Sequence, residues 1–421
     1  MHAKRRWLVA VVVTAAAVLA LGLVNSHQKK ARQEAALSRV KLQLATYDAF
    51  WAQIDANYFD PKFLETPECK KWRAEGRVQA AAAAYYFELY WNVFHDIVQK
   101  FPHSHIEANP KASPEQSLEA SKLPFSPERF KVLEGYLLGG VGFDAPMVRR
   151  QNGIEWVVGD VFVGTPAEKA GIEPGWKVIT DSSTLVPADD AVHFNGEFIP
   201  PIAGAQPIKI KFDVEQHVSP GERLVSRQLS GGITYLMIGL FDVPEFTNKV
   251  LAAIDAAGPA GLIVDLRRNS GGYTDEMMRV AARLLGDGAY IGTERGRAMP
   301  HDLRTAIGGP HYSGPLAVLI GPVSASGAEI LAAAIQDNRR GILLGRASNG
   351  SVLSAKYFPL PDGGTVMVPI EDFVRSGGRR IEASGVEPDI VVVPTLADVR
   401  AGRDPVIERA QLELTRVPPA R

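Results

Sequence analysis

The chain has 421 residues, a formal net charge of −1 and one cysteine. Its length allows about two or three domains with sizeable cores, and its composition is typical of a globular protein. The balanced charge argues against nucleic acid as a partner, and the single Cys69 excludes an internal disulfide, a zinc knuckle and a redox pair.

The N-terminus carries an export or anchoring signal. The basic residues Lys4–Arg6 precede an uncharged apolar run, Trp7–Val24. At about 1.5 Å per residue, this run nearly spans the ~30 Å hydrocarbon core of a bilayer, which favours a membrane anchor over a cleaved signal. Ala20–Gly22 fits the small-x-small pattern of a signal-peptide cleavage site, so a cleaved signal is the alternative. We expect residues 1–30 to hold the body of the chain outside the cytoplasm, in the periplasm or another extracytoplasmic space.

A helical domain is predicted next, over residues 35–110. Apolar residues recur at helical spacing from Leu42 to Ile54, and a second helical stretch, Val78–Val98, is rich in aromatic side chains such as Tyr90, Trp91 and Phe94. We interpret these aromatic residues as core rather than as a ligand cage.

Two histidines and a serine fall on the loop after these helices, at Phe101–Ile106, because Pro102 disfavours helix at the residue before it. His103 and His105 could chelate a metal, but the chain has no further Cys/His cluster and no HExxH motif. No metal site and no cofactor are therefore expected. The polar, Pro- and Ser-rich residues 111–128 are interpreted as a linker.

The following segment, 129–218, resembles a PDZ domain in two motifs, the glycine-rich turn at residues 139–143 and Glu155–Val178. The resemblance implies a β-rich domain whose turn offers backbone N–H groups to the carboxylate of a peptide. The residues of that peptide-binding turn are Gly140, Val141, Gly142 and Phe143.

From Gly231 short apolar strands alternate with helices, a pattern typical of an α/β domain with a largely parallel sheet. Strands are expected at Ile233–Ile238, Gly261–Leu266 and Leu316–Ile320, with a helix near Pro244–Ala257. We predict an α/β core over residues 219–398, followed by a tail at 399–421.

Ser326 stands where the strand Leu316–Ile320 breaks at Gly321 and a helix starts. A helix N-terminus has unpaired N–H groups that favour developing negative charge, so the position suits a nucleophile. The alternative is a capping box, in which Ser326 and Glu329 satisfy the helix end reciprocally.

Four motifs decide between these alternatives. They are Asp265–Gly272, Ser324–Glu329, Phe358–Gly363 and Gly385–Asp389. In order and approximate spacing they resemble the C-terminal processing peptidases and tricorn proteases. The resemblance implies a crotonase/Clp-protease-like α/β core with an inserted PDZ-like β-rich domain and an N-terminal helical domain.

In that family the middle serine of the Ser-Ala-Ser motif is the nucleophile, which corresponds to Ser326. The processing peptidases activate it with a lysine twenty-five residues later, but this chain has Ser351 there. A serine hydroxyl cannot act as the base, so a Ser/Lys pair requires Lys356, five residues further on.

The tricorn branch implies a different constellation. Ser104 and His105 occupy the place of its Ser-His pair, and Glu382 the place of its glutamate. His105 is then the base for Ser326, while Ser104 and Glu382 orient the imidazole. The alternative for Glu382 is a surface salt bridge with Arg379 or Arg380.

Backbone amides are expected to hold the oxyanion, one from Gly327 and one from the turn of Gly271 and Gly272, because glycine permits close approach. The favoured hypothesis is a serine endopeptidase that engages polypeptides through the PDZ-like domain and attaches to a membrane through its N-terminal segment. A rival is a catalytically inactive peptide-binding relative, since the usual lysine is absent; a non-proteolytic hydrolase is a third possibility.

Overall fold

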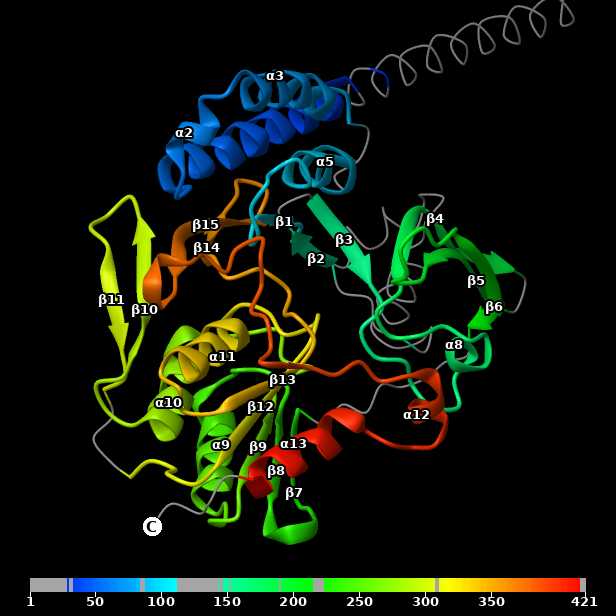
Figure 1. Ribbon diagram of the computed structural model, residues 1–421. Helices are drawn as coiled ribbons and strands as arrows, with labels where there is room; N and C mark the ends of the chain where they lie inside the picture. Colours follow the sequence, from blue (N-terminus) through cyan, green and yellow to red (C-terminus); the bar gives the residue numbers. More distant parts are fainter. Residues whose placement is uncertain are drawn as a thin grey trace, which may run out of the picture.

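The computed structural model describes residues 29, 33–83, 88–111, 143, 147–150, 153–188, 191–214, 223–306 and 310–416. Figure 1 shows N-terminal helices in blue and cyan, a green β-rich unit at one side and a larger α/β body. Within the described residues, no helix is both long and apolar enough to cross a membrane. The expected signal or anchor, residues 1–30, lies outside them apart from Lys29.

The N-terminal helices pack around an aromatic core. Residues 33–57 are helical and are followed by α2 (Pro61–Leu64), α3 (Pro67–Ala82), the π-helical turn η1 (Leu89–Phe94) and α5 (His95–Val98). The face predicted from the periodicity is buried from Tyr47 on, since Tyr47, Phe50, Trp51 and Ile54 are each no more than 1% exposed, but Leu42 at its start is 46% exposed. The helical domain therefore has its own hydrophobic core.

The second helical stretch differs from the prediction in two ways. Helix α3 begins at Pro67, well before Val78, because Thr66 caps it by accepting a hydrogen bond from the Cys69 amide. Tyr90 and Phe94 are buried as expected, but Trp91 is 39% exposed. The aromatic stripe is thus only partly core.

The β-rich unit is an antiparallel sheet of order β2-β3-β4-β5-β6. Its strands are β2 (Met147–Arg150), β3 (Gly153–Val157), β4 (Lys177–Ala188), β5 (Ala191–Ile199) and β6 (Ile208–Val214). The short helix α8 (Pro166–Lys169) begins after Thr165, whose hydroxyl accepts from the Glu168 amide. Phe143 is buried against Phe194 and Phe198. Residues 112–142 lie outside the described part, and with them Gly140, Val141, Gly142 and nearly all of the predicted linker.

The α/β body is built on a six-stranded sheet of order β16-β13-β12-β9-β8-β7, in which only the β7–β8 pairing is antiparallel. Its strands are β7 (Leu224–Gln228), β8 (Thr234–Ile238), β9 (Leu262–Asp265), β12 (Leu316–Ile320), β13 (Ile342–Gly345) and β16 (Ile390–Val391). The three strands predicted from apolar runs, β8, β9 and β12, are buried along their whole length. The predicted α/β class is confirmed, because strands buried on both faces read as continuous apolar runs.

Helices cover both faces of this sheet. One core holds side chains from α9 (Pro244–Asp255), α10 (Thr274–Leu285) and α11 (Gly327–Asp337). The core on the other face holds Val406, Ile407, Ala410 and Leu414 of α13 (Pro405–Arg416). Residues 405–416 are therefore part of the body and not a tail, and their apolar spacing of three and four residues was the signal for a packed helix.

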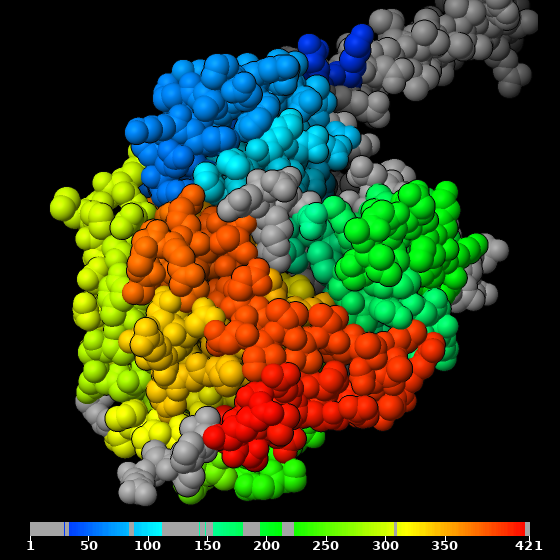
Figure 2. Space-filling view, in the orientation of Figure 1, coloured from blue at the N-terminus to red at the C-terminus, as the bar shows by residue number. Residues whose placement is uncertain are grey.

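A second sheet links the N-terminal helices to the body. Its order is β1-β15-β10-β11, with β14 also paired to β15. Its strands are β1 (Glu107–Asn109), β10 (Tyr290–Gly296), β11 (His301–Arg304), β14 (Ser354–Pro359) and β15 (Thr365–Val374). Leu360, Val366 and Val368 join the aromatic core of the helices, which lie on the orange β14–β15 region in Figure 2. Strand β1 thereby places the loop at residues 102–106 beside the body.

Candidate active site

Ser326 occupies a strained turn between β12 and α11. Its φ of 54° and ψ of −122° lie in a region that L-residues rarely adopt, at a cost of about 1–3 kcal/mol. Contacts on both sides hold it there: the Ala325 amide donates to the Asn269 carbonyl (3.0 Å) and the Ser326 amide to the Ser351 carbonyl (2.7 Å). Such strain persists where the surroundings overdetermine the conformation.

The predicted capping box is present at the start of α11, with the Glu329 carboxylate accepting from the Ser326 amide at 3.1 Å. The Ser326 hydroxyl nevertheless makes no capping hydrogen bond to α11. The half-buried hydroxyl is not committed to the helix end.

Glu329 is fully buried and collects four donors. One carboxylate oxygen accepts from the Ser348 hydroxyl (2.5 Å) and the Gly350 amide (2.7 Å). The other accepts from the amides of Ser351 (2.9 Å) and Ser326. Burial raises the pKa of Glu329 to about 7, although these hydrogen bonds oppose the rise. Glu329 ties the serine turn to the segment at residues 348–351.

Ser104, His105 and Glu382 form a second connected group. The amide and hydroxyl of Ser104 donate to the two oxygens of Glu382, at 2.6 and 2.9 Å. Ser104 Oγ also lies 2.7 Å from His105 Nδ1. Since the hydroxyl proton goes to Glu382, Oγ accepts from Nδ1–H, and this leaves Nε2 as the basic nitrogen of the ring. Ser104 and Glu382 are 2% and 5% exposed, so the group is set into the protein.

The salt-bridge alternative for Glu382 is wrong. Arg380 donates to Asp372 at 2.7 Å and Arg379 approaches Asp337 at 3.5 Å. Glu382 instead accepts from the Val352 amide at 2.9 Å, in addition to Ser104. Its carboxylate is therefore directed at the histidine loop rather than at a surface arginine.

The two groups meet at Ser351 and Val352. The Ser351 carbonyl accepts from the Ser326 amide, and the adjacent Val352 amide donates to Glu382. Among the described residues no hydrogen bond links Ser326 directly with His105. The backbone of this two-residue segment therefore connects the serine turn to the group that holds the histidine.

Among the described residues, neither Ser351, at the family's lysine position, nor Lys356 has a side-chain hydrogen bond to Ser326. The Ser351 hydroxyl donates to Asn349 at 2.7 Å. Lys356 lies exposed on β14, opposite Val368, where its charge acts on Glu371. Within the described part of the chain, no contact joins Lys356 to the serine turn.

The predicted oxyanion glycines have different roles. The Gly271 amide donates to Asn269 Oδ1 at 2.8 Å, so it is engaged. A Cβ on Gly271 would lie 2.6 Å from Ser326 Cβ, which explains why glycine is needed against the serine. In the described contacts the amides of Gly272 and Gly327 have no acceptor. These two amides are available to a developing oxyanion.

Asn269 was missed by the motif analysis as a positioning residue. It is fully buried, its carbonyl accepts from Ala325, and its side chain accepts from Gly271. Its place inside the Asp265–Gly272 motif was the available signal. His103, by contrast, contacts aromatic residues of the helical domain. The Tyr58 hydroxyl lies 2.6 Å from His103 Nδ1, and Phe59 packs edge-on against the imidazole ring.

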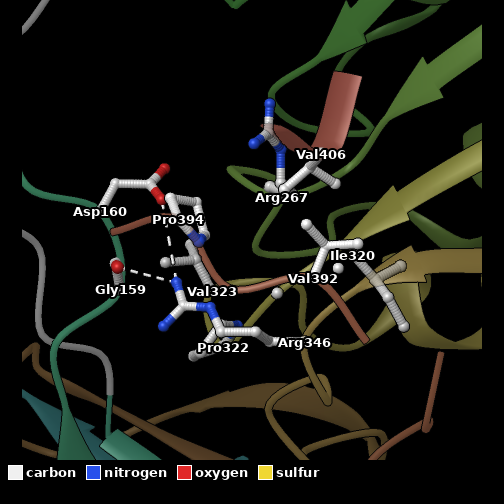
Figure 3. A pocket seen from close by; sticks show the side chains of 12 residues that line it. Gly159, Asp160, Arg267, Ile320, Pro322, Val323, Arg346, Val392, Pro394 and Val406 are labelled. Carbon is white, nitrogen blue, oxygen red and sulfur yellow. Dashed lines mark hydrogen bonds and ion pairs between the residues drawn. The ribbon is translucent and has the colours of Figure 1, made fainter. Parts of the chain in front are cut away.

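A pocket lies where the β-rich unit meets the body (Figure 3). Arg346 donates to the carbonyls of Val158 (3.0 Å) and Gly159 (2.7 Å) and lies 3.8 Å from Asp160. On a second contact between these parts, Arg400 binds Glu168 at 2.7 Å. Gly321, Pro322 and Val323, which follow β12, line this pocket, but Ser326 does not, and the pocket is part of the junction.

The resemblance to peptidases is confirmed by comparison with known proteins. Residues 232–392 match the model of Peptidase family S41. The chain is 30% identical over 198 residues to the carboxy-terminal-processing protease of Bartonella bacilliformis, covering 45% of each chain. It is 27% identical over 271 residues to the carboxyl-terminal-processing protease of Synechocystis sp., covering 61% of this chain and 62% of the relative. The matches thus span less than two thirds of these relatives.

Solved structures support the fold. The photosystem II D1 C-terminal processing protease superposes with a TM-score of 0.58 at 20% identity, over 89% of this chain and 96% of that one. The tricorn protease gives a TM-score of 0.50 at 16% identity, over 90% of this chain and 37% of that one. At these identities the likeness establishes the fold alone, an α/β core with the N-terminal helices attached.

Proposed function

We propose that this chain, whose residues 232–392 match Peptidase family S41, is a serine endopeptidase that cleaves polypeptides by acyl transfer at Ser326. The observation that carries the proposal is the presence of a strained serine turn together with a hydrogen-bonded Ser104–His105–Glu382 group, in which Ser104 and Glu382 are buried. A serine needs a base to become a nucleophile, and the tautomer argued for His105 has its basic nitrogen at Nε2.

In the proposed reaction His105 Nε2 takes the proton of Ser326 as Oγ bonds to the scissile carbonyl carbon. The resulting imidazolium is stabilised through Ser104 by the negative charge of Glu382. The carbonyl oxygen becomes an oxyanion and accepts from the amides of Gly272 and Gly327. Removal of one such donor typically costs about 3–4 kcal/mol of transition-state stabilisation.

The tetrahedral intermediate collapses by breaking the C–N bond, and His105 gives its proton to the departing amine. A water molecule then attacks the Ser326 ester, transfers a proton to His105 and releases the new carboxylate. The proton returns to Ser326, so the protein is regenerated without a net change.

We also propose that the β-rich unit engages substrate as a PDZ-like domain, with the backbone of Gly140, Val141, Gly142 and Phe143 receiving a peptide carboxylate. The capped helix after Thr165 and the strand β4 from Lys177 agree with the expected motif order. The buried side chain of Phe143 is consistent with a purely backbone contribution from that residue.

The location is part of the same proposal. The apolar run Trp7–Val24 behind Lys4–Arg6 supports an anchored or exported chain whose body lies outside the cytoplasm. A membrane would then be a partner of residues 1–30 only.

One observation favours a second function. Ser351 stands at the lysine position of the processing peptidases, which supports a peptide-binding protein without turnover. Labelling with a fluorophosphonate separates the two, because the probe bonds to an activated serine. Peptidase function predicts labelling that is lost in Ser326→Ala and kept in Ser226→Ala, a change at an exposed serine of β7. A well-folded chain without Ser326-dependent labelling would support the binding function.

A further inference from the structure

Three potential metal ligands lie on one face of the second sheet. His301 on β11 is directly across from Glu294 on β10. Glu371 is two residues from Phe373, the β15 partner of Glu294. Because side chains alternate with a period of two, all three side chains share a face. One ligand atom from each lies within 4.8 Å of the other two.

The distances are those of a preformed cluster. His301 Nε2 is 3.1 Å from Glu294 Oε2, and its Nδ1 is 3.9 Å from Glu371 Oε1. Zinc bound tetrahedrally to N and O atoms at 2.0–2.2 Å would place the ligand atoms about 3.4 Å apart. Because one ligand atom of each residue already lies within 4.8 Å of the other two, side-chain rotations that close the gaps by up to about 1.4 Å would reach that separation.

The cluster is closed at one side and open at the other. The side chains of Glu294, Glu371 and His301 are 8%, 22% and 50% exposed. Ser354 donates to Glu294 Oε1 at 2.5 Å, which fixes the carboxylate and leaves Oε2 directed at the cluster. A metal ligand is commonly oriented in this way by a hydrogen bond to its other atom.

Backbone geometry makes room for one ligand. Gly296 is the direct partner of Glu371. A Cβ on Gly296 would lie 2.8 Å from Glu371 Cγ and 2.4 Å from the Ile370 carbonyl. Only glycine at this position lets the Glu371 side chain lie across β10 toward Glu294.

The charges favour a cation. The carboxylates of Glu294 and Glu371 both approach His301 and lie in one cluster, so their like charges repel each other there. Within the described residues, the basic groups that act on Glu371 are His301 and the exposed Lys356. The charges of Asp372, Arg295 and Arg380 belong to the opposite face of the sheet.

We propose that Glu294, His301 and Glu371 form a binding site for a divalent first-row transition metal, Zn²⁺ in the first instance. One imidazole and two carboxylates suit such an ion, and water completes its coordination on the exposed side. The metal would link the β10–β11 hairpin to β15. The neighbouring strand β14 begins at Ser354, which is three residues after Ser351 in the chain. The site goes beyond the proposed peptidase function and does not depend on it.

No sequence motif indicated the site, because Glu294 and His301 are seven residues apart and Glu371 is seventy further on. The expectation of no metal site rested on motif spacing, which cannot detect ligands assembled from three strands.

The test is zinc binding to the full chain after treatment with EDTA, measured by equilibrium dialysis with metal analysis. The Ser326→Ala background prevents self-cleavage. We expect the parent chain to bind one Zn²⁺. Each of His301→Ala, Glu294→Gln and Glu371→Gln should abolish this binding or weaken its affinity more than about 100-fold. His95→Ala and Glu245→Gln change exposed helix residues and are matched controls that should bind Zn²⁺ as the parent does.

Thermal unfolding supplies a second readout that is independent of activity. Zinc should raise the melting temperature of the parent chain and the controls, and not that of the three variants, because a ligand bound only to the folded state stabilises it. Circular dichroism of the half-exposed His301→Ala variant checks that it is folded. Equal zinc stoichiometry in all variants, or none in the parent, would overturn the site and reduce the cluster to a His301–Glu294 ion pair.

Discussion

Ser104 binds Glu382 through both its amide and its hydroxyl, at 2.6 and 2.9 Å, although the two residues are 278 positions apart in the chain. The hydroxyl thereby stands between a buried carboxylate and His105. The loop after the N-terminal helices and the end of the α/β body must consequently fold together before the proposed base is oriented.

Loss of either partner of this pair should reduce activity through His105. In Glu382→Gln the acceptor of the Ser104 hydroxyl becomes neutral, and in Ser104→Ala the link to His105 is removed. We expect kcat/KM to fall by about 10²-fold or more in each, because general-base assistance is typically worth 10²–10⁴-fold.

The matched control is Glu387→Gln, at an exposed position five residues along the chain. It should cleave an unfolded protein substrate at the parent rate. Unchanged kcat/KM in both Ser104→Ala and Glu382→Gln would mean that the pair is only structural.

Gly271→Ala should impair the nucleophile without unfolding the chain. The new Cβ would lie 2.6 Å from Ser326 Cβ and 3.1 Å from its Oγ, so the serine must move. Misplacement of a reacting group by about 1 Å can cost about 10²-fold. We expect that loss in the rate of fluorophosphonate labelling.

Gly288→Ala tests whether backbone strain alone explains such a loss. Gly288 also has a positive φ, but its Cβ would meet nothing within 4 Å. It should label normally despite a similar loss of stability. Equal labelling defects in the two variants would contradict a steric effect on Ser326.

Glu329 should give the folded state a distinctive pH dependence. Its pKa is raised from 4.5 to about 7, so the folded chain holds the proton more tightly than the unfolded chain. The contribution of this group to the free energy of unfolding therefore falls as pH rises from about 4.5 to about 7, by about 3 kcal/mol in total.

Urea unfolding of the Ser326→Ala chain with and without Glu329→Gln isolates that contribution. As pH rises through this window, the free energy of unfolding of the chain that keeps Glu329 should fall relative to that of the Glu329→Gln chain. Parallel curves would show that Glu329 is ionised in both states or in neither.

Peptides should distinguish the role of the β-rich unit. If the backbone of residues 140–143 receives a carboxylate, peptides with a free C-terminus should bind Ser326→Ala about tenfold more tightly than their amides. Calorimetry measures both affinities. Equal affinity would contradict recognition of the chain end.

Local patterns predicted the parts of the fold that are determined locally. The apolar run Leu316–Ile320 and the helical spacing after Ser326 sufficed to place the serine at a strand–helix turn, since burial of short strands and helix periodicity are read over a few residues. The α13 helix at Pro405–Arg416 carried the same kind of signal and was nevertheless assigned to a tail.

Contacts between distant segments could not be read in this way. The engagement of the Gly271 amide by Asn269, and the four donors around Glu329, depend on backbone directions that composition and spacing do not encode. The association of Ser104 with Glu382 was expected only from the family resemblance. Spacing and periodicity therefore did not predict these contacts.

The central claim is that His105, and not a lysine, activates Ser326. It is tested most directly by turnover of an unfolded protein substrate at neutral pH by folded His105→Ala and Lys356→Ala chains, with the exposed His95→Ala as control. The account predicts a loss of about 10²–10⁴-fold in His105→Ala and parent rates in the other two. Full activity in His105→Ala, or abolished activity in Lys356→Ala, would contradict it.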